Sequence, residues 1–200
     1  MNGIMMCKIL KEDVRTSHIP IILLTAKDSL QDKEEGYQVG ADSYLTKPFS
    51  ATLLHSRINN LLESRKRLTE RFNTSTPHHN MDEKRALLAE SLNKLDNEFI
   101  EKINQLIEAR LSSEKIDIGY LADNMCMSKS TLYRKMKALT GLSTNEYVRK
   151  IKMQHAERLL LEGRYNISEV AFRVGINSVV YFRQCFKEEF GVLPSEYLKQ

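Results

Sequence analysis

Two sets of polar and basic side chains lie about fifty residues apart in the last third of the chain. Each set combines Lys and Arg, which pair with phosphates, with residues such as Ser, Thr, Gln and Val, which contact base edges in a major groove. The first set comprises Lys129, Ser130, Thr131, Tyr133, Arg134 and Lys137, and the second comprises Ser178, Val179, Val180, Tyr181, Arg183, Gln184 and Lys187. Because these residue types recognise double-stranded DNA, both sets are candidate DNA-binding residues.

Individual side chains in these sets suit different contacts with DNA. Arg134 is expected to contact a base, because Arg pairs in bidentate fashion with guanine. Lys129 and Lys137 are expected to meet phosphates. In the second set, either valine at positions 179–180 can touch a thymine methyl group, and Gln184 can read adenine.

The elements that position the two sets repeat each other. The segments Ile118–Tyr147 and Ile167–Tyr197 carry matching apolar residues, at an offset of 49 residues before an internal turn and 50 after it. Each copy predicts a short helix, a tight turn and a longer helix. Because the same pattern occurs twice, we expect both segments to fold into the same helical unit. This is the layout of a helix-turn-helix, in which the second helix enters a major groove.

Apolar residues at helical spacing divide each longer helix into a core face and an outer face. The expected core residues are Leu132, Met136 and Leu139 in the first copy and Phe182, Phe186 and Phe190 in the second. The candidate DNA-binding residues point elsewhere. Ser128 is the expected N-cap of the first of these helices, because a Ser side chain can accept a hydrogen bond from a backbone amide of the first turn.

Composition and charge narrow the class of protein further. The net charge is +4, yet residues 115–200 hold 14 Lys and Arg against 9 Asp and Glu, which favours a phosphate-binding face there. No apolar run approaches the roughly 18 residues of a membrane span. Three scattered cysteines are typical of a reduced, cytoplasmic protein, and the five histidines lack metal-binding spacing. We expect no cofactor, metal or catalytic site, because no phosphate loop, nucleophile motif or carboxylate pair stands out.

The first 63 residues alternate the signals of helices and strands. The apolar, β-branched run Ile19–Ala26 predicts a buried strand, and Asp42–Leu45 predicts a second short strand. Helical periods cover Asn2–Glu12 and Leu30–Val39, and Ser50 can cap a third helix whose apolar stripe is Leu53, Leu54, Ile58, Leu61 and Leu62. Strands that alternate with helices imply a parallel α/β sheet.

The middle of the chain allows two interpretations. Residues 64–81 are polar and read as a linker that is helical at its start. From Asp82 to Leu111 an amphipathic helix pattern returns, and its residues Leu88–Leu106 can form a short seam for a homodimer. The alternative, favoured for the second half Asn97–Leu111, is the first helix of the DNA-binding domain.

The first region resembles the receiver domain of two-component response regulators, through the stretches HIPIILLTA and GADSYLTKPF. The resemblance implies a flavodoxin-like fold in which Thr25 and Lys47 contact a phosphoryl group and Tyr44 is a rotamer switch. Lys47 would supply a charge-assisted donor and Thr25 a hydroxyl donor. It also places Met1–Gly3 just after the position of the phospho-accepting aspartate.

That alignment has consequences for regulation. The acceptor and the acidic pair that holds Mg²⁺ are expected upstream of Met1, so we expect no phospho-acceptor here and no reaction with acetyl phosphate. About 60 residues of an α/β sheet bury little apolar surface and leave a strand edge unpaired. We therefore expect this part to be loose in solution or held by a partner.

Residues 97–200 resemble the AraC/XylS-type DNA-binding domain, most closely in the stretch NISEVAFRVGINSVVYFRQCFKEEFGVLPSEYLK. The resemblance implies two helix-turn-helix units joined by a long helix, here Thr144–Leu161. At 1.5 Å per residue that helix is about 27 Å long, which approaches the roughly 34 Å between successive major grooves on one face of DNA. Gly163 is expected to end it, and Ser168 to cap the next short helix. Because members of the family often have a basic residue near the position of Gln184, the share of the second helix in base readout stays open.

The sequence thus predicts a mixed fold: an N-terminal partial α/β unit at residues 1–63, a linker and amphipathic helix at 64–96, and an all-α AraC-type domain at 97–200. We expect a transcription regulator of the two-component class that binds promoter DNA and has lost phosphorylation control. Such domains also form the C-terminal part of hybrid proteins, in which a sensor kinase would lie upstream. The alternative function is a protein-interaction fragment that pairs with a full-length regulator.

Overall fold

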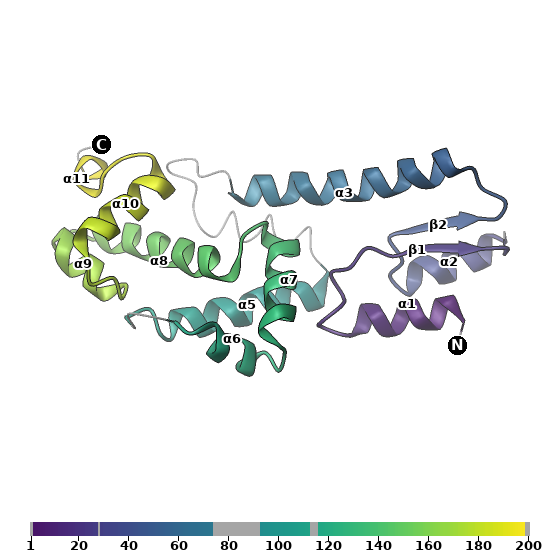
Figure 1. The fold of residues 1–200 in the computed structure, drawn as a ribbon, viewed down its shortest axis with the longest axis horizontal. Coiled ribbons are helices and arrows are strands. Elements are labelled where there is room, and N and C mark those ends of the chain that lie inside the picture. The colour runs from purple at the N-terminus through teal and green to yellow at the C-terminus, as the bar shows by residue number, and fades with distance from the viewer. Residues whose placement is uncertain (1, 28, 74–92, 113–115, 199–200) are drawn as a thin grey trace.

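The computed structural model describes residues 2–27, 29–73, 93–112 and 116–198 (Figure 1). The predicted seam begins at Leu88, outside these ranges, so only its second part can be placed. In the described ranges, no helix combines the length and the apolarity that a membrane crossing needs.

The N-terminal part contains a parallel pair of strands with a helix before each strand. The elements are α1 (Gly3–Glu12), β1 (Ile22–Thr25), α2 (Leu30–Gln38) and β2 (Ser43–Thr46). Ile22 pairs with Ser43 at one end of the ladder and Thr25 with Thr46 at the other. Side chains cap both helices, because Asn2 accepts a hydrogen bond from the Met5 amide and Ser29 from the Asp32 amide. The predicted parallel α/β arrangement is confirmed.

One prediction for this part is wrong in extent. The run Ile19–Ala26 was expected to be a buried strand, but the strand covers only Ile22–Thr25. Leu23 is buried in a small core with Cys7 and Tyr44, whereas Leu24 faces the other side of the sheet and is 42% exposed. Since side chains alternate between the two faces of a strand, β1 is buried only on the face of Leu23, whereas β2 is buried on both faces. The apolar run therefore overstates the burial of β1.

A long helix follows the sheet. Helix α3 (Ala51–Asn73) begins after Ser50, whose Oγ accepts a hydrogen bond from the Leu53 amide at 3.1 Å, as predicted. It continues well into the segment that was predicted to be a linker with a helical start. The predicted apolar stripe does not form a core, because Leu53, Ile58 and Leu62 are exposed. Helix α3 lies apart from the strands and contacts α7 of the C-terminal part instead (Figure 1).

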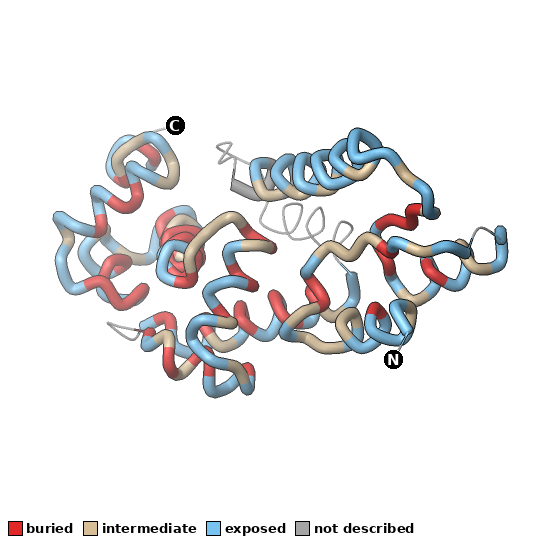
Figure 2. The backbone as a smooth tube through the Cα atoms, turned by 45° about the vertical axis from the view of Figure 1, so that its right-hand side comes forward, coloured by how far each residue is buried: buried red, intermediate tan, exposed pale blue. Residues whose placement is uncertain are grey.

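The C-terminal part is all-helical and has two hydrophobic cores. Its helices are α5 (Lys94–Glu108), α6 (Ile118–Asn124), α7 (Lys129–Thr140), α8 (Thr144–Leu161), α9 (Ile167–Arg173), α10 (Val179–Phe190) and α11 (Pro194–Tyr197). The first core joins α5, α6, α7 and the start of α8, and the second joins the end of α8 to α9, α10 and α11. The buried segments gather along these helices in Figure 2. Helix α5 buries Phe99, Ile103 and Ile107 in the first core, so this half of the amphipathic pattern packs within the chain.

The predicted repeat is visible in the helix lengths. Helices α6 and α9 have 7 residues each, and α7 and α10 have 12 each. Gly141 and Gly191 end the longer helices in the left-handed conformation, at φ 73° and 79°. The turns inside the units also correspond, with Cys126 at φ 52° where the second unit has Gly175 at φ 66°. The two segments therefore fold into the same helix-turn-helix unit.

The helix that joins the units has the bounds that the sequence predicts. Helix α8 runs from Thr144 to Leu161, starts with a capping box of Ser143 and Glu146, and is followed by Gly163 at φ 68°. The predicted cap of the next helix was wrong. Asn166, not Ser168, accepts a hydrogen bond from the Glu169 amide, and the Glu169 side chain accepts one from the Asn166 amide. This reciprocal pair starts the helix at residue 167, which places Ser168 inside the first turn.

Candidate nucleic-acid interface

Helix α7 separates a core face from an outer face, as predicted. Leu132, Met136 and Leu139 are buried in the first core. The candidate DNA-binding residues of this helix are exposed, apart from half-buried Thr131; they are Lys129, Ser130, Tyr133, Arg134 and Lys137. The first set therefore forms one accessible polar surface with three cationic side chains.

Hydroxyl groups organise the start of this surface. The Oγ of Ser128 accepts a hydrogen bond from the Thr131 amide at 3.1 Å, which confirms Ser128 as the N-cap. The same oxygen lies 2.9 Å from the hydroxyl oxygens of both Ser130 and Thr131. Arg134 donates from Nε to the backbone oxygen of Ser130 at 3.3 Å. This bond holds the stem of Arg134 along the helix, and the two Nη groups remain at its exposed end, as bidentate pairing with guanine requires.

Helix α10 presents the second set in the corresponding way. Phe182 and Phe186 are fully buried, and Phe190 packs partly against the same core. The exposed members of the set are Ser178, Val180, Tyr181, Arg183, Gln184 and Lys187. The two valines differ, because Val179 packs against the second core while Val180 is 77% exposed. Of the two, Val180 is accessible to a thymine methyl group.

Charged residues that the sequence reasoning missed lie beside α10. Arg149 of α8 lies 3.6 Å from Glu188, and Gln184 donates from Nε2 to Glu188 at 3.1 Å. Lys150 and Glu189 form a second ion pair between the same helices at 3.3 Å. A side-chain amide has two N–H donors, so the bond to Glu188 leaves Gln184 one donor and its oxygen, which are the groups that adenine recognition uses.

One buried and one exposed polar side chain near the second unit have shifted pKa values. Lys152 of α8 donates to the backbone oxygen of Gly175 at 3.2 Å, in the turn between α9 and α10. Burial lowers the pKa of Lys152. A hydrogen bond with Cys185, together with burial, raises the pKa of Tyr181. The neutral phenol of Tyr181 can therefore both donate and accept hydrogen bonds at neutral pH.

Two of the three residues of the receiver resemblance lie at the carboxyl ends of the strands, and the third, Tyr44, lies within β2. Thr25 ends β1, and its backbone oxygen accepts a hydrogen bond from the Lys47 amide at 2.7 Å. Tyr44 is buried and donates to the backbone oxygen of Lys27 at 3.1 Å, whereas the Lys47 side chain is exposed. These strand ends point away from helices α5 to α11 (Figure 1), so the receiver residues lie at the end of the molecule that is far from α10, whereas α7 lies between them.

Both parts of the chain match known domain families. Residues 121–200 match the family model of a helix-turn-helix domain, and residues 1–59 match the model of the response regulator receiver domain. The C-terminal part of the chain is therefore similar to helix-turn-helix domains of the AraC type, and its N-terminal part is similar to receiver domains.

Curated proteins show the same two similarities. The chain is 35% identical over 197 residues to histidine kinase P4 of Formosa agariphila, a match that covers 98% of this chain and 14% of that protein. It is 51% identical over 63 residues to the heme response regulator HssR of Staphylococcus saprophyticus, covering 32% of this chain and 27% of the relative. It is 32% identical over 99 residues to the DNA-binding dual transcriptional regulator Rns of Escherichia coli, covering 50% and 37%.

The chain therefore spans well under two thirds of the length of each of these relatives. The matches favour a DNA-binding regulator over the alternative of an interaction fragment that pairs with a full-length regulator. The activity in the name of the kinase belongs to a protein of which this chain matches a small part.

Proposed function

We propose that this chain is a sequence-specific DNA-binding transcription regulator of the two-component class. One observation carries the proposal: two helix-turn-helix units of equal helix lengths lie at the two ends of one 18-residue helix, and both expose polar and basic faces. At 1.5 Å per residue this helix is about 27 Å long, so one chain can place α7 and α10 in successive major grooves, which lie roughly 34 Å apart.

The proposed contacts follow from exposure and chemistry. Arg134 contacts guanine, Lys129 and Lys137 contact phosphates, and Val180 and Gln184 contact bases through α10. Ser130, Thr131, Tyr133, Ser178, Tyr181, Arg183 and Lys187 complete the two surfaces. We place the DNA-binding domain at residues 97–200, preceded by the linker region 64–96. The proposal assigns DNA binding, not catalysis, to the chain.

The N-terminal part supports the two-component class. Thr25 and Lys47 lie at the carboxyl ends of the two parallel strands and Tyr44 lies within β2, and their residue types are those that a phosphoryl switch uses. We propose that residues 1–63 are the receiver part of a two-component protein, that phosphorylation control is lost in this chain, and that a sensor kinase is the partner in an intact parent protein. Whether phosphoryl transfer reaches this chain is measured by intact mass after incubation with acetyl phosphate. We expect no added phosphoryl group, and an added group that disappears on substitution of one aspartate would contradict that expectation.

Selection from a pool of random DNA duplexes at a stated salt concentration tests the function, because affinity for DNA depends steeply on salt. We expect an enriched motif with two parts about one helical turn apart. Arg134→Ala should weaken binding to the selected duplex by about 1–3 kcal/mol and relax one base position. Arg57→Ala, on the exposed face of α3, is the matched control and should leave binding unchanged. Equal losses of Arg134→Ala on selected and random duplexes would remove the base-reading role.

A further inference from the structure

The loop between α1 and β1 packs against the first helix-turn-helix unit at a buried cluster of polar groups. Lys135 of α7 is fully buried, and so is Ser17 of the loop. The Nζ of Lys135 lies 2.5 Å from Oδ1 of Asp96, 2.9 Å from Oγ of Ser17 and 2.5 Å from the backbone oxygen of Val14. An ammonium group has three N–H donors, so each donor of Lys135 has an acceptor. The loop supplies two of these three acceptors.

The carboxylate of the cluster is also bonded on both oxygens. Ser17 donates from Oγ to Oδ1 of Asp96 at 2.7 Å, and Asn93 donates from Nδ2 to Oδ2 at 3.0 Å. Asn93 is the N-cap of α5, and its Nδ2 also lies 3.3 Å from the backbone oxygen of Ser17. The loop is thus bonded to α5 and α7, two helices of the first hydrophobic core that are far from it in sequence.

The loop supplies hydrogen-bond partners that water would otherwise provide to this ion pair. A buried ammonium and a buried carboxylate lose their hydration, and the loss is compensated only by close pairing and by hydrogen bonds to the remaining donors and acceptors. Burial lowers the pKa of Lys135, and the bond to Asp96 opposes that shift. Without Ser17 and the Val14 carbonyl, Lys135 would lose two of its acceptors and regain water.

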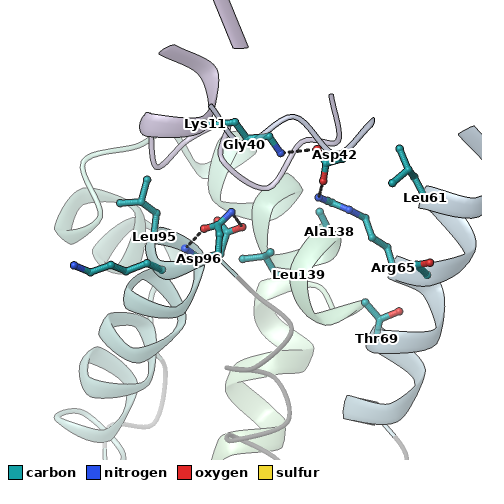
Figure 3. Close-up of a pocket in the computed structure, with 13 residues that line it drawn as sticks. Lys11, Gly40, Asp42, Leu61, Arg65, Thr69, Leu95, Asp96, Ala138 and Leu139 are labelled. Carbon is teal, nitrogen blue, oxygen red and sulfur yellow. Dashed lines mark hydrogen bonds and ion pairs between the residues drawn. The ribbon is translucent and has the colours of Figure 1, made fainter. Parts of the chain in front are cut away.

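Other contacts tie the same loop to the N-terminal part. Arg65 of α3 donates to the backbone oxygen of His18, and Lys11 donates to the backbone oxygen of Ile19 at 3.0 Å. Lys11 lies 2.7 Å and Arg65 4.0 Å from Asp42. These three residues line a cavity of about 460 Å³, which residues of α5 and α7 also line (Figure 3). A movement of the N-terminal part would therefore move the loop, and with it the two acceptors that the loop supplies to Lys135.

Docking of the loop leaves the candidate DNA face of α7 open. Lys135 lies on the covered side of the helix, whereas Tyr133, Arg134 and Lys137 remain exposed. Loop docking and DNA binding can therefore occur together.

We propose that the loop at residues 13–18 positions the first recognition helix for DNA, through the hydrogen bonds of Ser17 and Val14 to Lys135. Ser17 and Lys135 are then positioning residues that transmit the state of the N-terminal part to α7. This inference rests on the proposed DNA-binding function, but the docking of the loop can be measured without DNA.

Hydrogen exchange of the full chain tests the docking. Ser17→Ala removes one acceptor of Lys135 and one donor to Asp96. Because a buried charge without its hydrogen-bond partners destabilises the docked state, amides of the loop and of α7 should exchange roughly tenfold faster. Amides of α10 should not change. Ser56→Ala, an exposed serine of α3, is the matched control and should leave both regions as they are. Unchanged exchange in α7 overturns the proposal, whether or not the loop itself loosens.

Binding to DNA tests the positioning. With a duplex selected by the unaltered chain, Ser17→Ala should lower affinity by roughly tenfold, and with a random duplex by less than about twofold, because base contacts need an aligned helix and phosphate contacts are less selective. Equal losses on both duplexes overturn the positioning role. In a Lys135→Met background the effect of Ser17→Ala should become smaller, because only its bond to Asp96 is then left to lose, and fully additive effects would contradict the proposed path. If the unaltered chain selects no motif, the proposed function fails, while the exchange of α7 still decides whether the loop orders this helix.

Discussion

Mild acid is expected to weaken the contact between the two parts of the molecule through His18. This side chain is 7% exposed, and within the described part of the chain its Nδ1 has no hydrogen-bond partner. Burial lowers the pKa of His18 from 6.5 to about 4, and the nearby Lys135 contributes to the shift. Arg65 and Lys11 also lower the pKa, whereas Asp96 raises it. His18 is therefore neutral in the folded protein at neutral pH.

The size of the effect follows from the two pKa values. In the unfolded chain a histidine takes up a proton near pH 6.5, but His18 in the fold resists protonation until pH falls to about 4. Its neutral form therefore stabilises the fold fully above about pH 6.5, and this contribution is lost as the pH falls through that window. Between about pH 7.5 and pH 5 the expected loss is ~2 kcal/mol, and it approaches ~3 kcal/mol at lower pH.

Urea unfolding at the two pH values measures this loss, with the free energy taken from the midpoint and the slope of each curve. His18→Leu removes the titrating group and the unpaired nitrogen, so the variant should lose ~2 kcal/mol less than the unaltered protein between about pH 7.5 and pH 5. His55→Gln, in exposed α3, is the control and should behave as the unaltered protein does. If His18→Leu shows the same pH dependence as the unaltered protein, the assignment of the acid sensitivity to His18 is refuted.

Three further changes test local features of the helix-turn-helix units. Cys126→Gly should raise the free energy of unfolding by up to ~1 kcal/mol, because a backbone φ of 52° strains a non-glycine residue. Thermal melting measures this change, and a lower melting temperature of the variant would contradict it. Asn166→Ala should cost ~1 kcal/mol, whereas Ser168→Ala should change stability by less than ~0.5 kcal/mol, and the reverse order in urea unfolding would restore Ser168 as the cap. Val180→Ala should reduce the preference for thymine at one position of a selected duplex without lowering the melting temperature. Val179→Ala should lower the melting temperature and leave the preference for thymine unchanged. Similar effects of the two substitutions would contradict the difference in burial of the two valines.

Local patterns predicted most of the C-terminal part. The bounds of α8 follow from its capping residues and Gly163, and the faces of α7 and α10 follow from apolar spacing, since these signals lie within one or two turns of the residues that they govern. The cap of α9 was misplaced because two polar residues compete there, and the Glu169 that decides between them was not weighed. The Asn166–Glu169 spacing was present in the sequence and could have identified the cap.

Features that depend on distant partners could not be predicted in the same way. The exposure of Leu24 depends on what covers the second face of the sheet, and no local pattern contains that information. Lys135 follows Arg134 in the sequence and has the same charge, yet one side chain is buried and the other exposed. The acceptors of Lys135 lie 39, 118 and 121 residues away, so only the tertiary fold distinguishes the two cations.

The continuous helix α8 also fixes the angle between the two helix-turn-helix units. Each residue of an α-helix adds about 1.5 Å of rise and about 100° of rotation. Inserting or deleting one residue in its middle would change the separation of α7 and α10 only slightly, but would turn one of them by more than a quarter of a circle about the helix axis. If both units bind DNA as proposed, the length of α8 sets their relative rotation, and we expect an operator whose two half-sites lie on the same side of the DNA.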